Sequence, residues 1–165
     1  MSGSNGVVRV LNDRRRDTAL RVLLVDDDED YRTLVRYLVE QQDRFEVVGE
    51  AGDGATGISL AQQLQPDVVL LDLSMPLMDG LQSIQGIRSA SPGSRILVCS
   101  NFDRSFGQNA LDLGADDHVS KGAGWKEIYA RITSLLSNSP RAESNDGKEW
   151  VSPYILSQFR TAGTS

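Results

Sequence analysis

Short apolar runs alternate with segments of helical periodicity from residue 19 to about residue 138, and this alternation most constrains the fold. Runs that are apolar throughout are typical of strands buried on both faces. Because each run is followed by a helical segment, the strands must be parallel and joined by crossover helices. We therefore predict a doubly wound α/β domain. The predicted strands are residues 21–25, 45–48, 68–71, 96–100 and, from a weaker pattern, 118–120.

The segments between these runs place apolar residues three and four positions apart, which indicates amphipathic helices. Pro66 follows the second segment and Gly114 closes the fourth, as expected where helices end. The apolar residues assigned to the five helical faces are Tyr31, Leu34, Val35, Leu38 and Val39; Ile58, Ala61 and Leu64; Leu81, Ile84 and Ile87; Phe106, Ala110 and Leu113; and Ile128, Ile132, Leu135 and Leu136.

The two ends of the chain lack this alternation. Residues 1–18 have no periodicity and are rich in Arg, Asn, Gly and Ser, so we expect a flexible N-terminal arm. Residues 139–165 combine a polar linker with a short apolar segment at 150–159. The predicted organisation is therefore one folded domain over residues 19–138, with an arm before it and a linker and tail after it.

Composition excludes several classes of protein. The chain has no apolar run of about 18 residues and no secretory signal, so we expect a cytoplasmic protein with no membrane partner. Cys99 is the single cysteine and His118 the single histidine. One cysteine excludes an internal disulfide framework and a cysteine-based zinc site.

The predicted domain is strongly acidic. Of the chain's 23 acidic and 17 basic residues, 18 acidic and 10 basic ones fall within residues 19–138, a net charge of −8. Proteins bind the phosphate backbone of nucleic acids through Lys and Arg. The charge therefore argues against direct nucleic acid binding by this chain.

Polar and acidic residues follow the predicted strands, at the edge where doubly wound sheets gather their functional groups. These residues are Asp26, Asp27, Asp72, Ser100 and Lys121. Neighbouring carboxylates raise one another's pKa unless a cation compensates their charge, and Mg²⁺ suits a site of one to three carboxylates. With one lysine and one hydroxyl beside it, such a site fits phosphoryl transfer to a carboxylate.

Four segments occur in the order and spacing of a known family, and together they resemble a bacterial response-regulator receiver domain over about residues 20–138. The resemblance implies a flavodoxin-like (βα)5 fold with strand order 2-1-3-4-5. The Ser-Lys-Gly-Ala sequence at 120–123 is most similar to the branch that usually carries a C-terminal LuxR-type helix-turn-helix. The four segments are Val-Leu-Leu-Val-Asp-Asp-Asp (22–28), Pro-Asp-Val-Val-Leu-Leu-Asp-Leu-Ser-Met-Pro-Leu-Met-Asp-Gly (66–80), Ile-Leu-Val-Cys-Ser (96–100) and Gly-Ala-Asp-Asp-His-Val-Ser-Lys (114–121).

The resemblance assigns Asp72 as the phosphoacceptor and as part of the metal site. Asp27 matches the direct Mg²⁺ ligand, and Asp26 matches a ligand that acts through water. The backbone carbonyl of Ser74 matches the third protein ligand. Asp28 and the acids that follow it are instead expected to cap the first helix and to favour its macrodipole.

The remaining site residues are also assigned by resemblance. Lys121 matches the lysine that contacts the phosphoryl oxygens, and Ser100 matches the switch hydroxyl. His118 stands where the family keeps a switch aromatic ring, although an ordinary surface histidine is an equal alternative. Asn101 replaces the usual small residue, so we expect it to narrow access to the phosphoryl site.

These assignments predict a phosphorylation-operated switch that receives its phosphoryl group from a sensor histidine kinase and is not otherwise an enzyme. The output surface would be residues 102–136, with a phosphorylation-dependent homodimer as one consequence. The chain would then act by protein contact, or it would be a fragment of a DNA-binding regulator. A Mg²⁺-dependent phosphatase or Toprim-like enzyme is disfavoured, because Asp72-Leu73-Ser74 lacks the second aspartate of an Asp-x-Asp motif.

Overall fold

The computed structural model describes residues 19–75, 80–101 and 104–138. The predicted arm and the predicted linker and tail lie outside these residues. All five described strands form one parallel sheet in the order β2-β1-β3-β4-β5, so the predicted fold and strand order are confirmed. The strands are β1 (Leu20–Val25), β2 (Phe45–Ala51), β3 (Val68–Leu71), β4 (Arg95–Ser100) and β5 (Asp117–Ser120).

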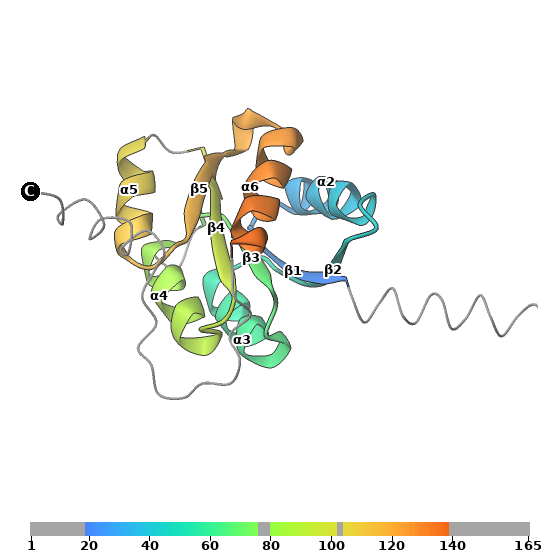
Figure 1. Cartoon of the computed structure of the whole chain (residues 1–165). Helices are drawn as coiled ribbons and strands as arrows, with labels where there is room; N and C mark the ends of the chain where they lie inside the picture. The colour runs from blue at the N-terminus through green and yellow to red at the C-terminus, as the bar shows by residue number, and fades with distance from the viewer. Residues whose placement is uncertain (1–18, 76–79, 102–103, 139–165) are drawn as a thin grey trace, which may run out of the picture.

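Helices cover both faces of the sheet (Figure 1). Helices α3, α4 and α5 pack on one apolar cluster, and α2 and α6 pack on another across the sheet. None of the helices in the described part of the chain has the length and hydropathy needed to cross a membrane. The helices are α2 (Glu29–Glu40), α3 (Gly54–Leu64), α4 (Gly80–Ala90), α5 (Arg104–Asp112) and α6 (Trp125–Ser137), with a 3-10 turn η1 (Lys121–Ala123) before α6.

Two sequence expectations differ from the structure. Strand β2 continues past residue 48 to Ala51, because an edge strand pairs on one side and accepts half-exposed residues that break an apolar run. On α2, Leu34 does not join the buried face: it is 52% exposed, whereas Val35 and Val39 are buried. The sheet-facing stripe of α2 is narrower than the apolar residues of its sequence suggest.

Polar residues and glycine define the ends of helices. Asp28 is the N-cap of α2, as predicted, and its side chain accepts a hydrogen bond from the Tyr31 amide at 3.0 Å. Asp53 caps α3 in the same way through the Thr56 amide. Gly114 has a φ of 109° just after α5, a conformation that favours glycine.

One buried carboxylate connects α4 and β4 to the start of β5. Asp116, whose side chain is 1% exposed, pairs with Arg88 at 2.6 Å and with Arg95 at 2.9 Å. It also accepts a hydrogen bond from the Ile96 amide at 2.8 Å. Because Asp116 immediately precedes β5, these bonds fix where β5 begins, and hence where Lys121 emerges from its end.

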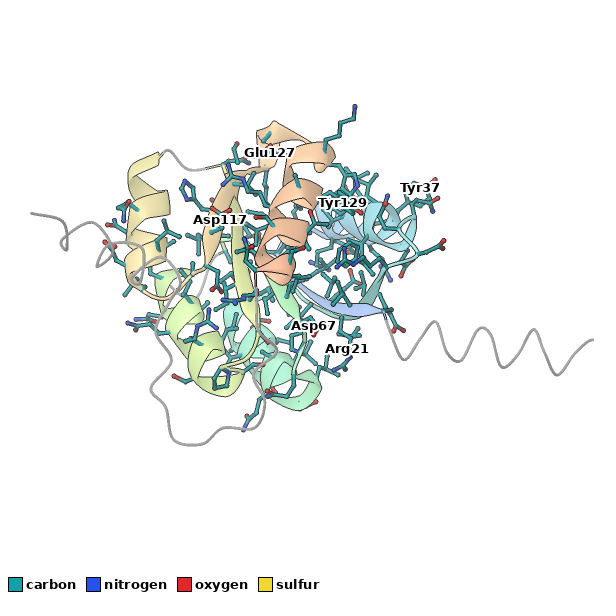
Figure 2. All side chains as sticks on the ribbon, in the orientation of Figure 1. Arg21, Tyr37, Asp67, Asp117, Glu127 and Tyr129 are labelled. Atoms are coloured by element: carbon teal, nitrogen blue, oxygen red, sulfur yellow. The ribbon has the colours of Figure 1, made fainter. Side chains whose placement is uncertain are left out.

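We expect Asp116→Ala to lower the free energy of unfolding by about 3–5 kcal/mol, because its two largely buried arginine partners lose the ion pairs that they make with it. The matched control is the neighbouring Asp117→Ala (Asp117 is labelled in Figure 2). Asp117 pairs with the more exposed Arg131, so its loss costs about 1 kcal/mol or less. Urea unfolding measures both, and equal losses would contradict the assigned role of Asp116.

Candidate functional site

The sheet itself places two carboxylates side by side. Asp26 and Asp72 directly follow the adjacent strands β1 and β3. The Asp26 amide donates to the Ala51 carbonyl at 2.9 Å, and the Asp72 amide donates to the Val25 carbonyl at 2.8 Å. Both residues therefore continue the strand hydrogen bonding, which fixes their backbones at the carboxyl edge.

Asp26 is 5% exposed, and both of its carboxylate oxygens have partners. Oδ1 accepts a hydrogen bond from the Asp28 amide at 2.9 Å, and Oδ2 lies 2.6 Å from Lys121 Nζ. The Arg32 guanidinium donates to the backbone carbonyl of Asp26 at 2.6 Å. Side chain and backbone of Asp26 are thus held independently.

Asp72 is 2% exposed and shares Lys121 with Asp26. Its Oδ1 accepts from the Ser74 amide at 3.0 Å, and its Oδ2 lies 3.4 Å from Lys121 Nζ. Lys121 therefore bridges the two carboxylates and lies closer to Asp26. This arrangement brings the sequence-predicted acceptor and the sequence-predicted lysine into direct contact.

Burial and charge shift the acid–base properties of this site. Burial raises the pKa of Asp26, and the nearby charge of Asp72 adds to the effect against the hydrogen bonds from Lys121 and Asp28. Burial also opposes the charged form of Lys121, but its bond to Asp26 and the charge of Asp72 outweigh that cost and raise its pKa. Lys121 is therefore a cation at neutral pH, and the site still holds an excess of negative charge.

Three carboxylates converge closely enough to hold one metal ion. Oxygen atoms of Asp26, Asp27 and Asp72 lie within 4.8 Å of one another. Asp27 is exposed, unlike the other two, so the cluster opens to solvent. All-oxygen donors, few in number and open to water, fit Mg²⁺ in both charge and ligand type. Ser74 lies two residues after Asp72, and the role of its carbonyl as a metal ligand stays a prediction.

The hydroxyl of Ser74, just after β3, and that of Ser100, at the end of β4, meet beside Asp72. Ser100, at the end of β4, is 6% exposed, and its Oγ lies 3.3 Å from the Oγ of Ser74. Asn101 follows it and is exposed. The structure therefore places Ser100 next to the expected acceptor loop, with Asn101 at the solvent side of the same edge.

His118 belongs to β5, and its ring lies against α5. A Cβ atom at Gly107 of α5 would come within 2.3 Å of the His118 ring. The ring therefore occupies the space that the missing side chain of Gly107 leaves open. Its Nδ1 is buried and has no hydrogen-bond partner among the described residues.

Sequence reasoning missed two residues that contact the site. Tyr31 was assigned only to an apolar helix face, yet its ring centroid lies 4.3 Å from Lys121 Nζ. Arg32, which holds the Asp26 carbonyl, was not singled out. Their position, directly after the acidic residues 26–30 and in the first turn of α2, was the available signal. Cys99 is buried in β4, and burial raises the pKa of its thiol to about 12.

The site and sheet define a class of protein: an α/β receiver domain with an acidic pocket at the carboxyl ends of β1 and β3. Residues 22–133 match the family model of the response regulator receiver domain. The chain belongs to this family.

Relatives and solved structures agree with that assignment. The chain is 34% identical to the transcriptional regulatory protein LiaR of Bacillus subtilis, over 87% of this chain and 66% of LiaR. It is 33% identical to the chemotaxis protein CheY of Halobacterium salinarum, over 72% of this chain and 98% of that protein. The receiver domain of NarL from Mycobacterium tuberculosis superimposes with a TM-score of 0.68 at 33% identity, covering 73% of this chain and 98% of that structure.

The matched relatives differ in what surrounds the receiver. The chain covers 66% of LiaR but only 26% of a protein-glutamate methylesterase/protein-glutamine glutaminase of Maricaulis maris, to which it is 38% identical. Receiver domains thus occur both in transcriptional regulators and in an enzyme. The chain spans less than two thirds of these longer relatives, so their further activities are not properties shown for it.

We expect Asp26→Asn to raise the melting temperature by about 2–6 °C in the absence of Mg²⁺. A raised pKa means that the folded state disfavours the carboxylate, so the stability present at low pH is lost as the pH rises through that pKa. Asparagine removes the charge and keeps an acceptor for the Asp28 amide.

The control for this prediction is Asp53→Asn, since hydrogen bonds from Thr56 lower the pKa of this acid. The Asp53 variant should show no rise in melting temperature. Scanning calorimetry at pH 7 without divalent cations compares the two variants. A melting temperature of Asp26→Asn at or below that of the unmodified protein would contradict the prediction that the charged Asp26 carboxylate destabilises the folded state.

Proposed function

We propose that this chain is a phosphorylation-operated switch whose phosphoacceptor is Asp72. The observation that carries the proposal is the buried Asp72 carboxylate at the carboxyl end of β3, in contact with Lys121 and next to the solvent-exposed Asp27. A buried carboxylate with one cation and an open acidic neighbour suits attack on an incoming phosphoryl group. The family assignment supports the same chemistry.

In the proposed reaction, an Asp72 oxygen forms a bond to phosphorus as the bond to the donor breaks. The donor is the phosphohistidine of a sensor histidine kinase, and its imidazole is the leaving group. Asp26, Asp27, Asp72 and the Ser74 carbonyl would hold Mg²⁺, which supplies positive charge for the phosphoryl oxygens. Lys121 then neutralises a further oxygen from its place beside Asp72.

The added phosphoryl charge would give Ser100 a new partner and would change the surroundings of His118. Ser100 would exchange its hydroxyl contact with Ser74 for a hydrogen bond to the phosphoryl group. We propose that His118 follows this movement as the switch residue. Its ring fills the space beside Gly107 of α5, so a rearrangement of β5 and α5 changes its surroundings directly.

We propose that the switch acts by changing its contacts with another protein chain. Residues 104–136 contain α5, β5 and α6, most of the predicted output surface; residues 102 and 103 of that surface lie outside the described residues. We propose a phosphorylation-dependent homodimer through this surface, without direct nucleic acid binding by this chain. The alternative is a receiver that belongs to a longer DNA-binding regulator; its support is the similarity to the transcriptional regulatory protein LiaR, of which the match covers 66%.

The decisive experiment incubates the chain with acetyl phosphate and Mg²⁺ and measures the intact mass. We expect a gain of one phosphoryl group, lost in Asp72→Asn, because that substitution removes the attacking oxygen but keeps the shape of the side chain. The matched control is Asp67→Asn at the other end of β3, where Asp67 accepts a hydrogen bond from the Arg21 amide at 2.7 Å (Figure 2). This control should still gain the phosphoryl group. An unmodified mass for the parent chain would overturn the proposal.

We also propose that Asn101 slows loss of the phosphoryl group by narrowing the entrance to Asp72. Its exposed position, directly after Ser100, supports this role. Asn101→Ala should increase the rate constant of autodephosphorylation by about threefold to tenfold, since water reaches phosphorus more freely. Loss of the phosphorylated mass with time measures the rate. Asn109→Ala, an exposed asparagine on α5, is the control, and equal rates in both variants would contradict the proposal.

A further inference from the structure

The lysine of the candidate site has a third neighbour besides its two carboxylates. Lys121 begins the 3-10 turn η1, and its side chain extends between Asp26 and Asp72. The ring of Tyr31 lies against the same ammonium, with its centroid 4.3 Å from Nζ. Cation–π attraction operates within about 6 Å of a ring centroid and strengthens where water is excluded. The lysine side chain is only 12% exposed, so water contributes little on this side.

Local structure fixes the Tyr31 ring. Its amide donates to the Asp28 cap, which sets its place in the first turn of α2, and the side chain packs against the apolar cluster beneath. Tyr31 also lines a cavity of about 20 Å³ together with Asp26, Asp72 and Cys99. Burial raises the pKa of the Tyr31 phenol, so the ring is uncharged and adds no competing anion.

Simple packing does not account for this placement. A core-filling side chain needs only apolar neighbours, whereas Tyr31 directs its ring toward the one ammonium of the acidic site. Lys121 has four flexible side-chain torsions, so holding its ammonium in one place costs conformational entropy. A ring on a third side restricts the ammonium to a position that touches Asp26 and Asp72 at once.

We propose that Tyr31 is the positioning residue of Lys121. Its ring keeps the ammonium between the two carboxylates, so that Lys121 is already in place when a phosphoryl group arrives at Asp72. The claim that Lys121 is in place for an arriving phosphoryl group rests on the proposed function. The placement of Lys121 in the unphosphorylated chain is independent of that function.

Two substitutions distinguish the effect of the aromatic ring face from the effect of filling the same space with an apolar side chain. Tyr31→Phe keeps the aromatic face and removes the hydroxyl, whereas Tyr31→Leu keeps an apolar side chain and removes the face. Tyr37→Leu is the matched control, since Tyr37 lies on the same helix but is 60% exposed and points outward (Figure 2). Tyr31→Met, whose flexible side chain adapts to the cavity, takes the place of Tyr31→Leu if that variant does not fold.

The first measurement needs neither metal nor phosphodonor. Protons on the ε-carbon of Lys121 lie near the ring face, so their NMR signals should be shifted upfield in the parent chain. The shift should persist in Tyr31→Phe and Tyr37→Leu and vanish in Tyr31→Leu. An unshifted signal in the parent chain, or one unchanged by Tyr31→Leu, overturns the proposal.

The second measurement is the rate constant of phosphorylation by acetyl phosphate with Mg²⁺. Tyr31→Leu should lower it by about threefold to tenfold, the loss expected for one partly desolvated cation–π contact. Tyr31→Phe should restore it to within about twofold of the parent value. An equal loss in Tyr31→Phe and Tyr31→Leu would overturn the proposal. If the parent chain gains no phosphoryl group, the proposed function fails, while the NMR comparison still decides where Lys121 is held.

Discussion

The structure depends on an imbalance of charge: two buried carboxylates, Asp26 and Asp72, share one ammonium, that of Lys121. In a medium of low polarity, one positive charge does not compensate two or three negative ones. The site is therefore electrostatically incomplete as the polypeptide makes it. A divalent cation completes it, which is why the same residues that strain the fold suit phosphoryl transfer.

Parallel topology makes this concentration of charge possible. Because β1 and β3 are adjacent and parallel, the residues after both strands emerge at the same edge. Lys121 directly follows β5, which lies two strands away from β3. The position of Lys121 therefore depends on the register of β5. The buried Asp116 sets this register through its two arginines and the Ile96 amide. The ion pairs of Asp116 before β5 thus hold Lys121, after β5, beside the excess of carboxylates at the site.

The sequence predicted features that depend on pattern and missed those that depend on distance. Parallel strands end at one edge, so the order of apolar runs alone was enough to place Asp26, Asp72 and Lys121 together. The extension of β2 was missed because its last half-exposed residues are not apolar. The contact between Tyr31 and Lys121 could not be predicted, since it joins residues 90 positions apart and depends on ring orientation. The apolar periodicity of this segment predicts that Tyr31 faces inward, but it does not predict which side chain Tyr31 contacts.

The resting contacts also bear on how a switch of this kind balances its two states. Lys121 is closer to Asp26 than to Asp72, and Ser100 contacts Ser74. Under the proposed mechanism, Lys121 and Ser100 each exchange an existing protein partner for a phosphoryl oxygen. Neither side chain gives up a water molecule to do so. The gain from the new charge-assisted bonds is then reduced by the loss of the old ones. Under that mechanism the two states would differ by a small free energy, so that one phosphoryl group would be sufficient to shift the population between them.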